Sequence, residues 1–192
     1  MIEVEAVKTE SQRTQVHAQL KQHGQLYVDI WQFGINTALR ISDLLSITMD
    51  QMRAIDQERH ELTLMESKTK KTKTITLNAK SLEVVSRRLQ DYPEDVYLFQ
   101  TTSPRFGKRS PAKPINRRSV SRVFERVGNQ VAPKVKLGTH SMRKTRGYAM
   151  HADGRSLESI CAMLNHSHPA VTMKYIGITK EDTQRTYTDF VL

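Results

Sequence analysis

Two pairs of side chains combine residue types that often do chemistry, each at helical spacing. Arg40 precedes Asp43 by three residues, so on a helix the carboxylate could hold the guanidinium in place. His140 and Arg143, in THSMRKTRG, have the same spacing, so a proton-transferring imidazole and a permanent cation would share one helix face. Each pair alone also fits a plainer interpretation: a surface ion pair for the first, and a solvated or capping histidine for the second.

Two further candidates lie in the segment MLNHSHPAVTMKYIG. His166 follows an apolar helical stretch, and Tyr175 ends a short helix that Pro169 can begin. On their own they fit a histidine that complements a helix dipole and a tyrosine packed on the core. Lys68 is less distinctive still, because it is one of several lysines in a polar stretch where most must be solvated: Lys68, Lys70, Lys71, Lys73 and Lys80.

The elements that must position these residues can be predicted from hydrophobic periodicity. Residues 11–39 predict two successive helices broken by Gly24 and Gly34, followed by a short helix that Ser42 can cap. Alternation in 60–66 and 73–78 predicts a β-hairpin with a basic tip. Further helices are expected from Asn78 to before Pro93, from Asn116 onward, at about 139–151, at 156–165, from 169 to 175 and at about 179–190. The fold class is therefore mainly α with a small antiparallel β-sheet (α+β).

The composition points to a polyanionic partner. The 192 residues suit a single domain, and Lys+Arg 30 against Asp+Glu 20 gives a formal net charge of +10. Unpaired basic residues concentrate in the loop 101–114 and on one face of the helix that follows it, and these are candidate nucleic-acid contacts: Arg105, Lys108, Arg109, Lys113, Arg117, Arg118 and Arg122.

Several other classes of protein are not supported. The single cysteine, Cys161, cannot form an intramolecular disulfide or a CxxC metal site. No stretch approaches 18 consecutive apolar residues, and the N-terminus MIEVEAVKTE lacks the basic and apolar regions of a signal peptide. We therefore expect a cytoplasmic protein with no membrane partner, and its charge makes nucleic acid the first partner to test.

Taken in order, the candidates resemble the catalytic set of the tyrosine recombinase (phage integrase) family: Arg40, Lys68, His140, Arg143, His166 and Tyr175. The strings TALRISDLLSIT, ESKTKKTKTITL, THSMRKTRG and MLNHSHPAVTMKYIG are similar to the family's local motifs, and the 26 residues from His140 to His166 and nine from there to Tyr175 match its usual spacing. The resemblance covers about residues 20–180.

The resemblance implies a tyrosine recombinase catalytic-domain fold and a metal-free, nucleotide-free transesterification. Tyr175 would attack a DNA phosphodiester to give a 3′-phosphotyrosyl link, while Arg40 and Arg143 clamp the phosphate. Lys68 would protonate the leaving 5′-oxygen, although a slip of register would exchange it for Lys70 or Lys71. His140 would assist proton transfer and His166 would bind a phosphate oxygen. Asp43 would hold Arg40 in place.

The resemblance also implies partners. Double-stranded DNA would lie in a C-shaped cradle contacted by Lys70, Lys71, Lys73 and the basic residues of 105–122. The tail, residues 176–192, could dock on a neighbouring protomer to give a homo-tetramer on two duplexes, or fold back on its own chain. A monomer is possible without DNA, and an accessory DNA-bending protein is possible with it. We expect residues 1–192 to form a single catalytic domain with a lead-in at 1–20, lacking the family's N-terminal core-binding domain.

The sequence departs from the family pattern at two positions. Asn165 replaces a glycine that often takes a positive φ, and asparagine is the next most tolerant residue there. Lys144 stands where the family often has histidine, a change we expect to be neutral or DNA-facing. Two alternatives stay open: a catalytically silent DNA-binding or regulatory relative, and an enzyme that relaxes supercoils like type IB topoisomerases.

Overall fold

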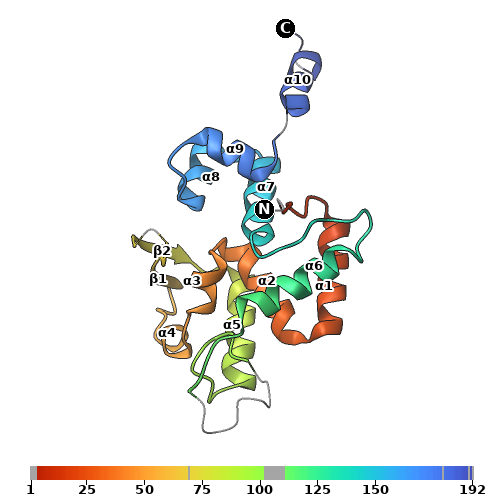
Figure 1. Ribbon diagram of the computed structural model, residues 1–192. Coiled ribbons are helices and arrows are strands. Elements are labelled where there is room, and N and C mark those ends of the chain that lie inside the picture. Colours follow the sequence, from red (N-terminus) through yellow and green to blue (C-terminus); the bar gives the residue numbers. More distant parts are fainter. Residues whose placement is uncertain (1–3, 69, 102–110, 179, 190, 192) are drawn as a thin grey trace.

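The computed structural model describes residues 4–68, 70–101, 111–178, 180–189 and 191. Within these ranges the chain is mainly helical with one two-stranded antiparallel sheet, as the sequence predicts (Figure 1). The helices are α1 (Glu10–His23), α2 (Gln25–Thr37), α3 (Ile41–Leu45), α4 (Met49–Arg53), α5 (Ala79–Asp91), α6 (Arg117–Gly128), α7 (Ser141–Ala152), α8 (Leu157–Leu164), α9 (Pro169–Ile176) and α10 (Lys180–Asp189). The strands are β1 (Glu61–Met65) and β2 (Thr72–Thr76).

Only one of the two glycines expected to break the first helical region does so. Gly24 has φ 115° and separates α1 from α2, a conformation that residues with a Cβ rarely adopt. Gly34, in contrast, lies inside α2. A Cβ at Gly34 would lie 2.1 Å from Met142 Sδ, so this glycine allows α7 to pack closely against α2. The predicted break at Gly34 is wrong because the glycine serves helix packing.

The turn from α2 into α3 differs from the prediction in its cap. Ala38 takes a left-handed conformation with φ 51°, and the chain enters α3 at Ile41 with Arg40, not Ser42, as the N-cap residue. Ser42 therefore lies in the first turn of α3, where its hydroxyl donates to Asp43 Oδ1 at 3.3 Å. The short helix α4 was not predicted, although Thr48 and Gln51 form a capping box at its start.

The hairpin is held in register by an apolar inner face. Leu62 pairs with Ile75 and Leu64 pairs with Lys73, so these four side chains lie on the same side of the sheet. Leu62 is buried and Lys73 is half-buried, whereas the residues described at the tip are exposed. One lysine of the hairpin thus faces the protein.

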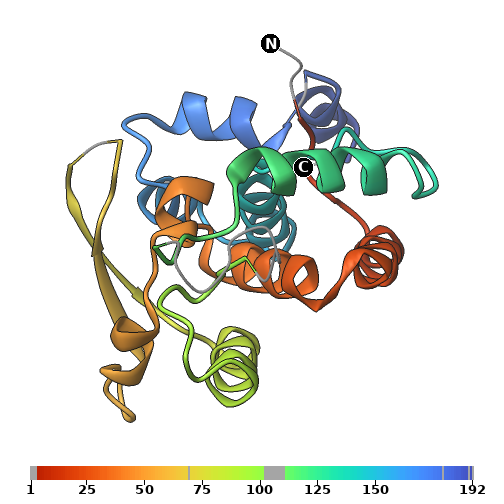
Figure 2. The ribbon, with the colours of Figure 1, turned by 60° about the horizontal axis from the view of Figure 1, so that its bottom comes forward.

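The buried apolar side chains that the structure describes form two hydrophobic clusters. The larger one joins α1, α2, α5 and α6 through residues such as Leu20, Trp31 and Phe124. The smaller one lies among α7, α8 and α9 and includes Ile160, Leu164 and Ile176. Figures 1 and 2 show α7 in the middle of the molecule, between the larger body and the pair α8 and α9. This arrangement brings residues of the larger body together with residues of α8 and α9 beside α7.

The last helix, α10, stands apart from the rest of the molecule (Figure 1). Within the described residues, none of the helices is long and apolar enough to cross a membrane.

Candidate active site

The two arginines of the motif meet where α2, α7 and α8 end or begin. Arg143, on α7, is 2% exposed, and its guanidinium donates to the carbonyl oxygens of Ala38 and Leu164, the latter at 2.7 Å. Arg40 lies two residues after Ala38, at the start of α3. The carbonyl oxygen of Ala38, at the end of α2, therefore ties Arg143 to the turn that carries Arg40.

The tyrosine and the two histidines lie beside these arginines. Tyr175 Oη is 3.4 Å from His140 Nδ1, and the phenol also hydrogen-bonds Arg143. The rings of His166 and Tyr175 pack edge to face with centroids 5.0 Å apart. His166 Nδ1 lies 3.0 Å from Thr172 Oγ1, a contact that leaves its Nε2 for another partner. The structure thus brings together five of the six residues predicted to be catalytic.

The environment shifts the pKa values of these groups in ways that suit them to different tasks. Burial raises the pKa of Tyr175, and the Arg143 guanidinium partly offsets this shift. Partial burial lowers the pKa of His140, and the charges of Arg117 and Arg143 lower it further. Burial and the charge of Arg143 also lower the pKa of His166. At neutral pH the phenol is therefore protonated and both imidazoles are neutral.

The hairpin contributes a lysine that was predicted only as a DNA contact. Lys73 Nζ donates to Met163 O at 2.7 Å, near the end of α8. Burial lowers the pKa of Lys73 to about 8, with Arg143 as the next largest cause. Lys68, the predicted general acid, is exposed in the turn after β1. Lys70 and Lys71, its alternatives, are also exposed, so Lys73 is the hairpin lysine that lies within the arginine cluster.

The carboxylate of Asp43 does not pair with the Arg40 guanidinium, so this prediction is wrong; the two residues are joined by a backbone hydrogen bond from Asp43 N–H to the Arg40 carbonyl oxygen. Asp43 Oδ1 accepts a hydrogen bond from the backbone N–H of Ser67 at 2.9 Å and another from the Ser67 hydroxyl. The partner of Arg40 is instead Glu66, through Oε1. The i, i+3 argument assumes that both residues are helical, whereas Arg40 is the N-cap residue of α3 with an extended backbone, φ −66° and ψ 146°. Asp43 therefore anchors the residue that precedes Lys68.

Comparison with known proteins agrees with this geometry. A model of the phage integrase family matches residues 3–182. The chain is 34% identical over 158 residues to the "Probable integrase/recombinase YoeC" of Bacillus subtilis (strain 168), covering 82% of this chain and 81% of that protein. The chain belongs to the phage integrase family.

Solved structures show the same fold. The crystal structure of XerA recombinase matches with a TM-score of 0.72 at 13% identity, covering 98% of this chain and 65% of that one. A lambda integrase tetramer bound to a Holliday junction matches with a TM-score of 0.66 at 14% identity, covering 91% of this chain and 49% of that one. The chain also spans about half the length of two further curated relatives, 47% and 50%. It has the fold of a tyrosine recombinase catalytic domain, and its family places it among the site-specific recombinases and integrases.

Three residues of the integrase site were missed from the sequence or given no role in it. Glu66 is 1% exposed and pairs with Arg40, and Thr172 is fully buried beside His166. Asn165 has φ 51°, which confirms that the turn survives the loss of glycine, but its amide also donates to Glu66 Oε2 at 2.7 Å. Local spacing carried no signal for Glu66, since its partners lie 26 and 99 residues away.

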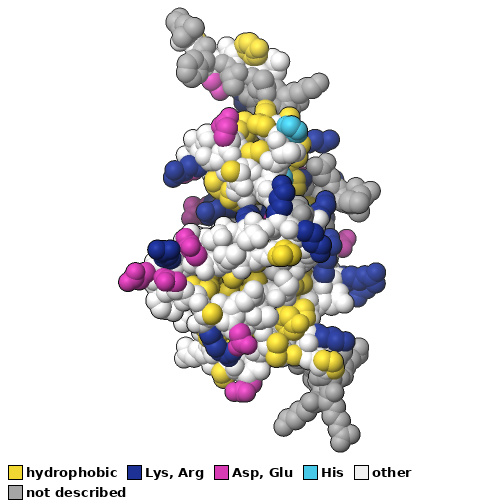
Figure 3. Space-filling model, turned by 90° about the vertical axis from the view of Figure 1, so that its left-hand side faces the viewer, with side chains coloured by type: hydrophobic (Ala, Val, Ile, Leu, Met, Phe, Trp, Pro, Cys, Tyr) yellow, Lys and Arg dark blue, Asp and Glu magenta, His cyan; other side chains and the backbone are white. Residues whose placement is uncertain are grey.

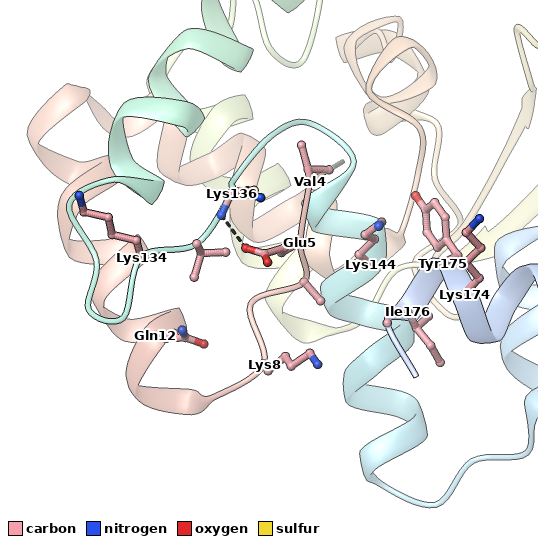
Figure 4. Close-up of a pocket in the computed structure, with 13 residues that line it drawn as sticks. Val4, Glu5, Lys8, Gln12, Lys134, Lys136, Lys144, Lys174, Tyr175 and Ile176 are labelled. Carbon is pink, nitrogen blue, oxygen red and sulfur yellow. Dashed lines mark hydrogen bonds between the residues drawn. The ribbon is translucent and has the colours of Figure 1, made fainter. Parts of the chain in front are cut away.

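Lys144 is neither exposed nor turned toward solvent, contrary to the expectation of a DNA-facing change. It is 7% exposed, and its Nζ lies 5.4 Å from the centroid of the Tyr175 ring. Figure 4 shows Lys144 and Tyr175 at one end of a pocket of about 530 Å³, with Lys134 and Lys136 toward the other end. Tyr175, the predicted nucleophile, therefore has a cation near its ring as well as near its hydroxyl.

Of the predicted DNA contacts that the structure describes, Lys73 is half-buried and the others are exposed: Lys70, Lys71, Lys113, Arg117, Arg118 and Arg122. Arg117, at the start of α6, is near enough to His140 to lower its pKa. Figure 3 shows basic side chains across the middle and along the right-hand edge of the face that carries the hairpin, with acidic side chains mainly at its left. Arg105, Lys108 and Arg109 lie outside the described residues.

Metal ligands are not gathered in this site. The part of the chain that the structure describes holds no group of three or more His, Cys, Asp or Glu side chains that could bind a metal ion. The positive charge at the site comes from arginine and lysine side chains of the chain itself.

Proposed function

We propose that this integrase domain cleaves and rejoins double-stranded DNA through a 3′-phosphotyrosyl intermediate formed on Tyr175. The observation that carries the proposal is the position of the Tyr175 hydroxyl, which lies 3.4 Å from a neutral imidazole and is hydrogen-bonded to a buried arginine. Catalytic hydrogen bonds of this length commonly shorten when substrate binds.

In the cleavage step, Tyr175 Oη attacks the phosphorus and its proton passes to His140. The bond from phosphorus to the 5′-oxygen breaks, and the electron pair of that bond leaves with the oxygen, which takes a proton from Lys68. The free 5′-hydroxyl later attacks the phosphotyrosyl link of a partner strand and reverses these transfers. No net oxidation, metal or nucleotide is needed, because the phosphotyrosine keeps the energy of the broken ester.

The arginines answer the main electrostatic demand of this reaction. Negative charge builds up on the non-bridging phosphate oxygens in the transition state, and Arg40 and Arg143 keep their charge at any working pH. Removing one such donor commonly costs about 3 kcal/mol of transition-state stabilisation. His166 supports them through Nε2, since its Nδ1 is held by Thr172.

The proposed partner is duplex DNA, bound by the exposed lysines and arginines through phosphate contacts that depend on salt rather than on base sequence. The assembly we propose is a homo-tetramer on two duplexes, with the chain acting in the cytoplasm at the nucleoid; the lambda integrase tetramer bound to a Holliday junction supports a four-protomer assembly. An accessory protein that bends DNA would help where the duplex must curve.

The test is covalent capture on a pool of nicked duplexes with randomised sequence around the nick, in which the cleaved strand diffuses away. The chain is mixed with the pool without added metal, and adducts are isolated on denaturing gels, sequenced and mapped by mass spectrometry. We expect an adduct on Tyr175 that Tyr175→Phe abolishes and Arg143→Lys strongly reduces.

Other outcomes would contradict the proposal. An adduct that survives Tyr175→Phe would place the nucleophile elsewhere. Salt-sensitive binding with no adduct would favour the silent DNA-binding alternative, and relaxation of a supercoiled plasmid without strand exchange would favour the topoisomerase-like alternative.

A further inference from the structure

Glu66 is a buried carboxylate that joins three parts of the site. Its side chain is 1% exposed, its Oε1 pairs with Arg40, and its Oε2 accepts from Asn165 Nδ2 at 2.7 Å. Burial of a carboxylate is costly unless its oxygens are bonded, and here each oxygen has a partner of its own. Glu66 therefore links the end of β1 to the start of α3 and to the turn that follows α8.

The ion pair leaves most of the Arg40 guanidinium available. A guanidinium has five N–H donors, and Glu66 engages Arg40 through Nη1. The Arg40 side chain retains 16% exposure while Glu66 is almost fully covered. Glu66 can thus fix the plane of the guanidinium without occupying the donors that bind a phosphate.

Glu66 also offsets repulsion among the cations of the site. Arg143 and Arg40 both lower the pKa of Lys73, whereas Glu66 and, to a smaller extent, Asp43 raise it, and Glu66 also raises the pKa of Arg143. Three cations held this close repel one another in the absence of an anion. A buried carboxylate among them keeps the cluster assembled before the phosphate arrives, so that little reorganisation is needed during the reaction.

Asn165 extends this link to His166. It is the C-cap of α8, in a left-handed conformation, between Leu164, whose carbonyl accepts from Arg143, and His166. A glycine at this position could form the same turn but would have no amide to offer Glu66. The side chain of Asn165 therefore ties the turn that carries His166 to Glu66. The same carboxylate pairs with Arg40.

We propose that Glu66 and Asn165 form a positioning pair that fixes Arg40 and His166 relative to each other for strand cleavage. The inference rests on the proposed recombinase function and assigns Glu66 a role that the six-residue motif does not contain. Glu66 does not touch the reacting atoms and acts through its two partners.

The test separates DNA binding from chemistry on a duplex recovered from the randomised pool. Glu66→Gln keeps the size of the side chain and removes its charge. We expect the rate constant of adduct formation at saturating DNA to fall about tenfold or more, because small misplacements of catalytic groups are costly, while the Kd for the duplex changes by about twofold at most. Asn165→Gly keeps the turn and should cost about threefold in the same rate constant.

The double variant Glu66→Gln/Asn165→Gly should be no slower than Glu66→Gln, because a glutamine has one acceptor oxygen and cannot hold both Arg40 and Asn165, so the link between them is already broken in the single variant. The matched control is Glu61→Gln, which makes the same substitution at an exposed position on β1, the strand that Glu66 follows, and should keep the wild-type rate. A Glu66→Gln rate equal to wild type, or losses that multiply in the double variant, would overturn the inference. So would a Glu66→Gln variant whose only defect is a lower melting temperature.

A second measurement keeps the inference apart from the proposed function. The Nε–H signal of Arg40, assigned with Arg40→Lys in spectra of the 15N-labelled chain, should shift and its guanidinium should rotate faster in Glu66→Gln but not in Glu61→Gln. If the wild-type chain forms no adduct, the proposed function fails, and this spectrum still decides whether Glu66 positions Arg40. An Arg40 signal unchanged by Glu66→Gln would reject the pair.

Discussion

Lys68 and Lys73 lie on one hairpin, and their surroundings suit them to different tasks. Lys73 is held against α8 by its bond to Met163 O, whereas Lys68 follows Ser67, which Asp43 anchors, and is exposed. A general acid must reach the leaving oxygen of bound DNA, so we keep Lys68 in that role. We propose that Lys73, which is held in place, acts as a stationary cation beside the phosphate.

A substrate with sulfur at the 5′-bridging position tests this assignment, because a thiolate leaves without a proton. We expect Lys68→Ala to slow adduct formation on normal DNA about 100-fold and the sulfur substrate to restore most of the rate. Lys73→Ala should also slow the reaction but should gain nothing from sulfur. Restoration of Lys73→Ala instead would exchange the two roles.

The lowered pKa of Lys73 predicts that DNA binding takes up a proton at alkaline pH. Because burial and Arg143 hold this pKa at about 8, the ammonium is largely deprotonated at pH 9, and a bound phosphate raises the pKa again. Near pH 6.5 Lys73 is already charged, so its contribution should vanish. Calorimetric titrations with duplex DNA in two buffers of different ionisation enthalpy would measure the uptake.

The control for this titration is Lys73→Arg, whose guanidinium stays charged throughout. Its binding should show less proton uptake at pH 9 than the wild-type chain. Equal uptake by the two proteins would mean that other groups take the proton.

Helices and strands with a local hydrophobic repeat could be predicted from the sequence. Features that depend on contacts between distant segments were missed. The hydrophobic periods of α5 and α6 and the alternation of the hairpin were enough to place those elements. Gly34 and Ser42 were misinterpreted because both residue types have several uses: one makes room for Met142, and the other follows a cap instead of forming it.

The candidate site could likewise be predicted only in part. Its six-residue motif could be recognised because order and spacing are visible in the chain, and five of the six side chains lie together in the structure. The pairing of Arg40 with Glu66 in place of Asp43 could not be predicted, since it depends on how the hairpin folds back over α3. The same limit applies to the burial of Lys144.

The element that most determines the site is α7. It carries Arg143, begins next to His140, and packs against both α2 and the pair α8 and α9. Gly147 allows the last of these contacts, because a Cβ there would lie 2.6 Å from Ile176 Cγ2, next to Tyr175 in the sequence. The distance between Tyr175 and Arg143 is thus set by the packing of helices rather than by loops.

For the whole molecule, the position of α10 bears on assembly. This helix stands apart from the body, and Tyr187 and Val191 are 77% and 89% exposed. Large apolar side chains on a projecting segment are typical of interaction surfaces. They favour docking of the tail on a neighbouring protomer over folding back on its own chain.

The double variant Tyr187→Ser/Val191→Ser tests this docking in a Tyr175→Phe background, which prevents cleavage during the measurement. We expect single duplexes to be bound with unchanged affinity, because the tail is distant from the basic residues described around the hairpin and α6. Complexes of four protomers on two duplexes, counted by native mass spectrometry, should become about tenfold rarer at the same protein concentration, because two apolar anchors are lost from each contact. Thr188→Ser, a mild change on the same helix, is the control and should assemble normally. A variant that assembles fully but unfolds at a lower temperature as a monomer would show that the tail packs on its own chain.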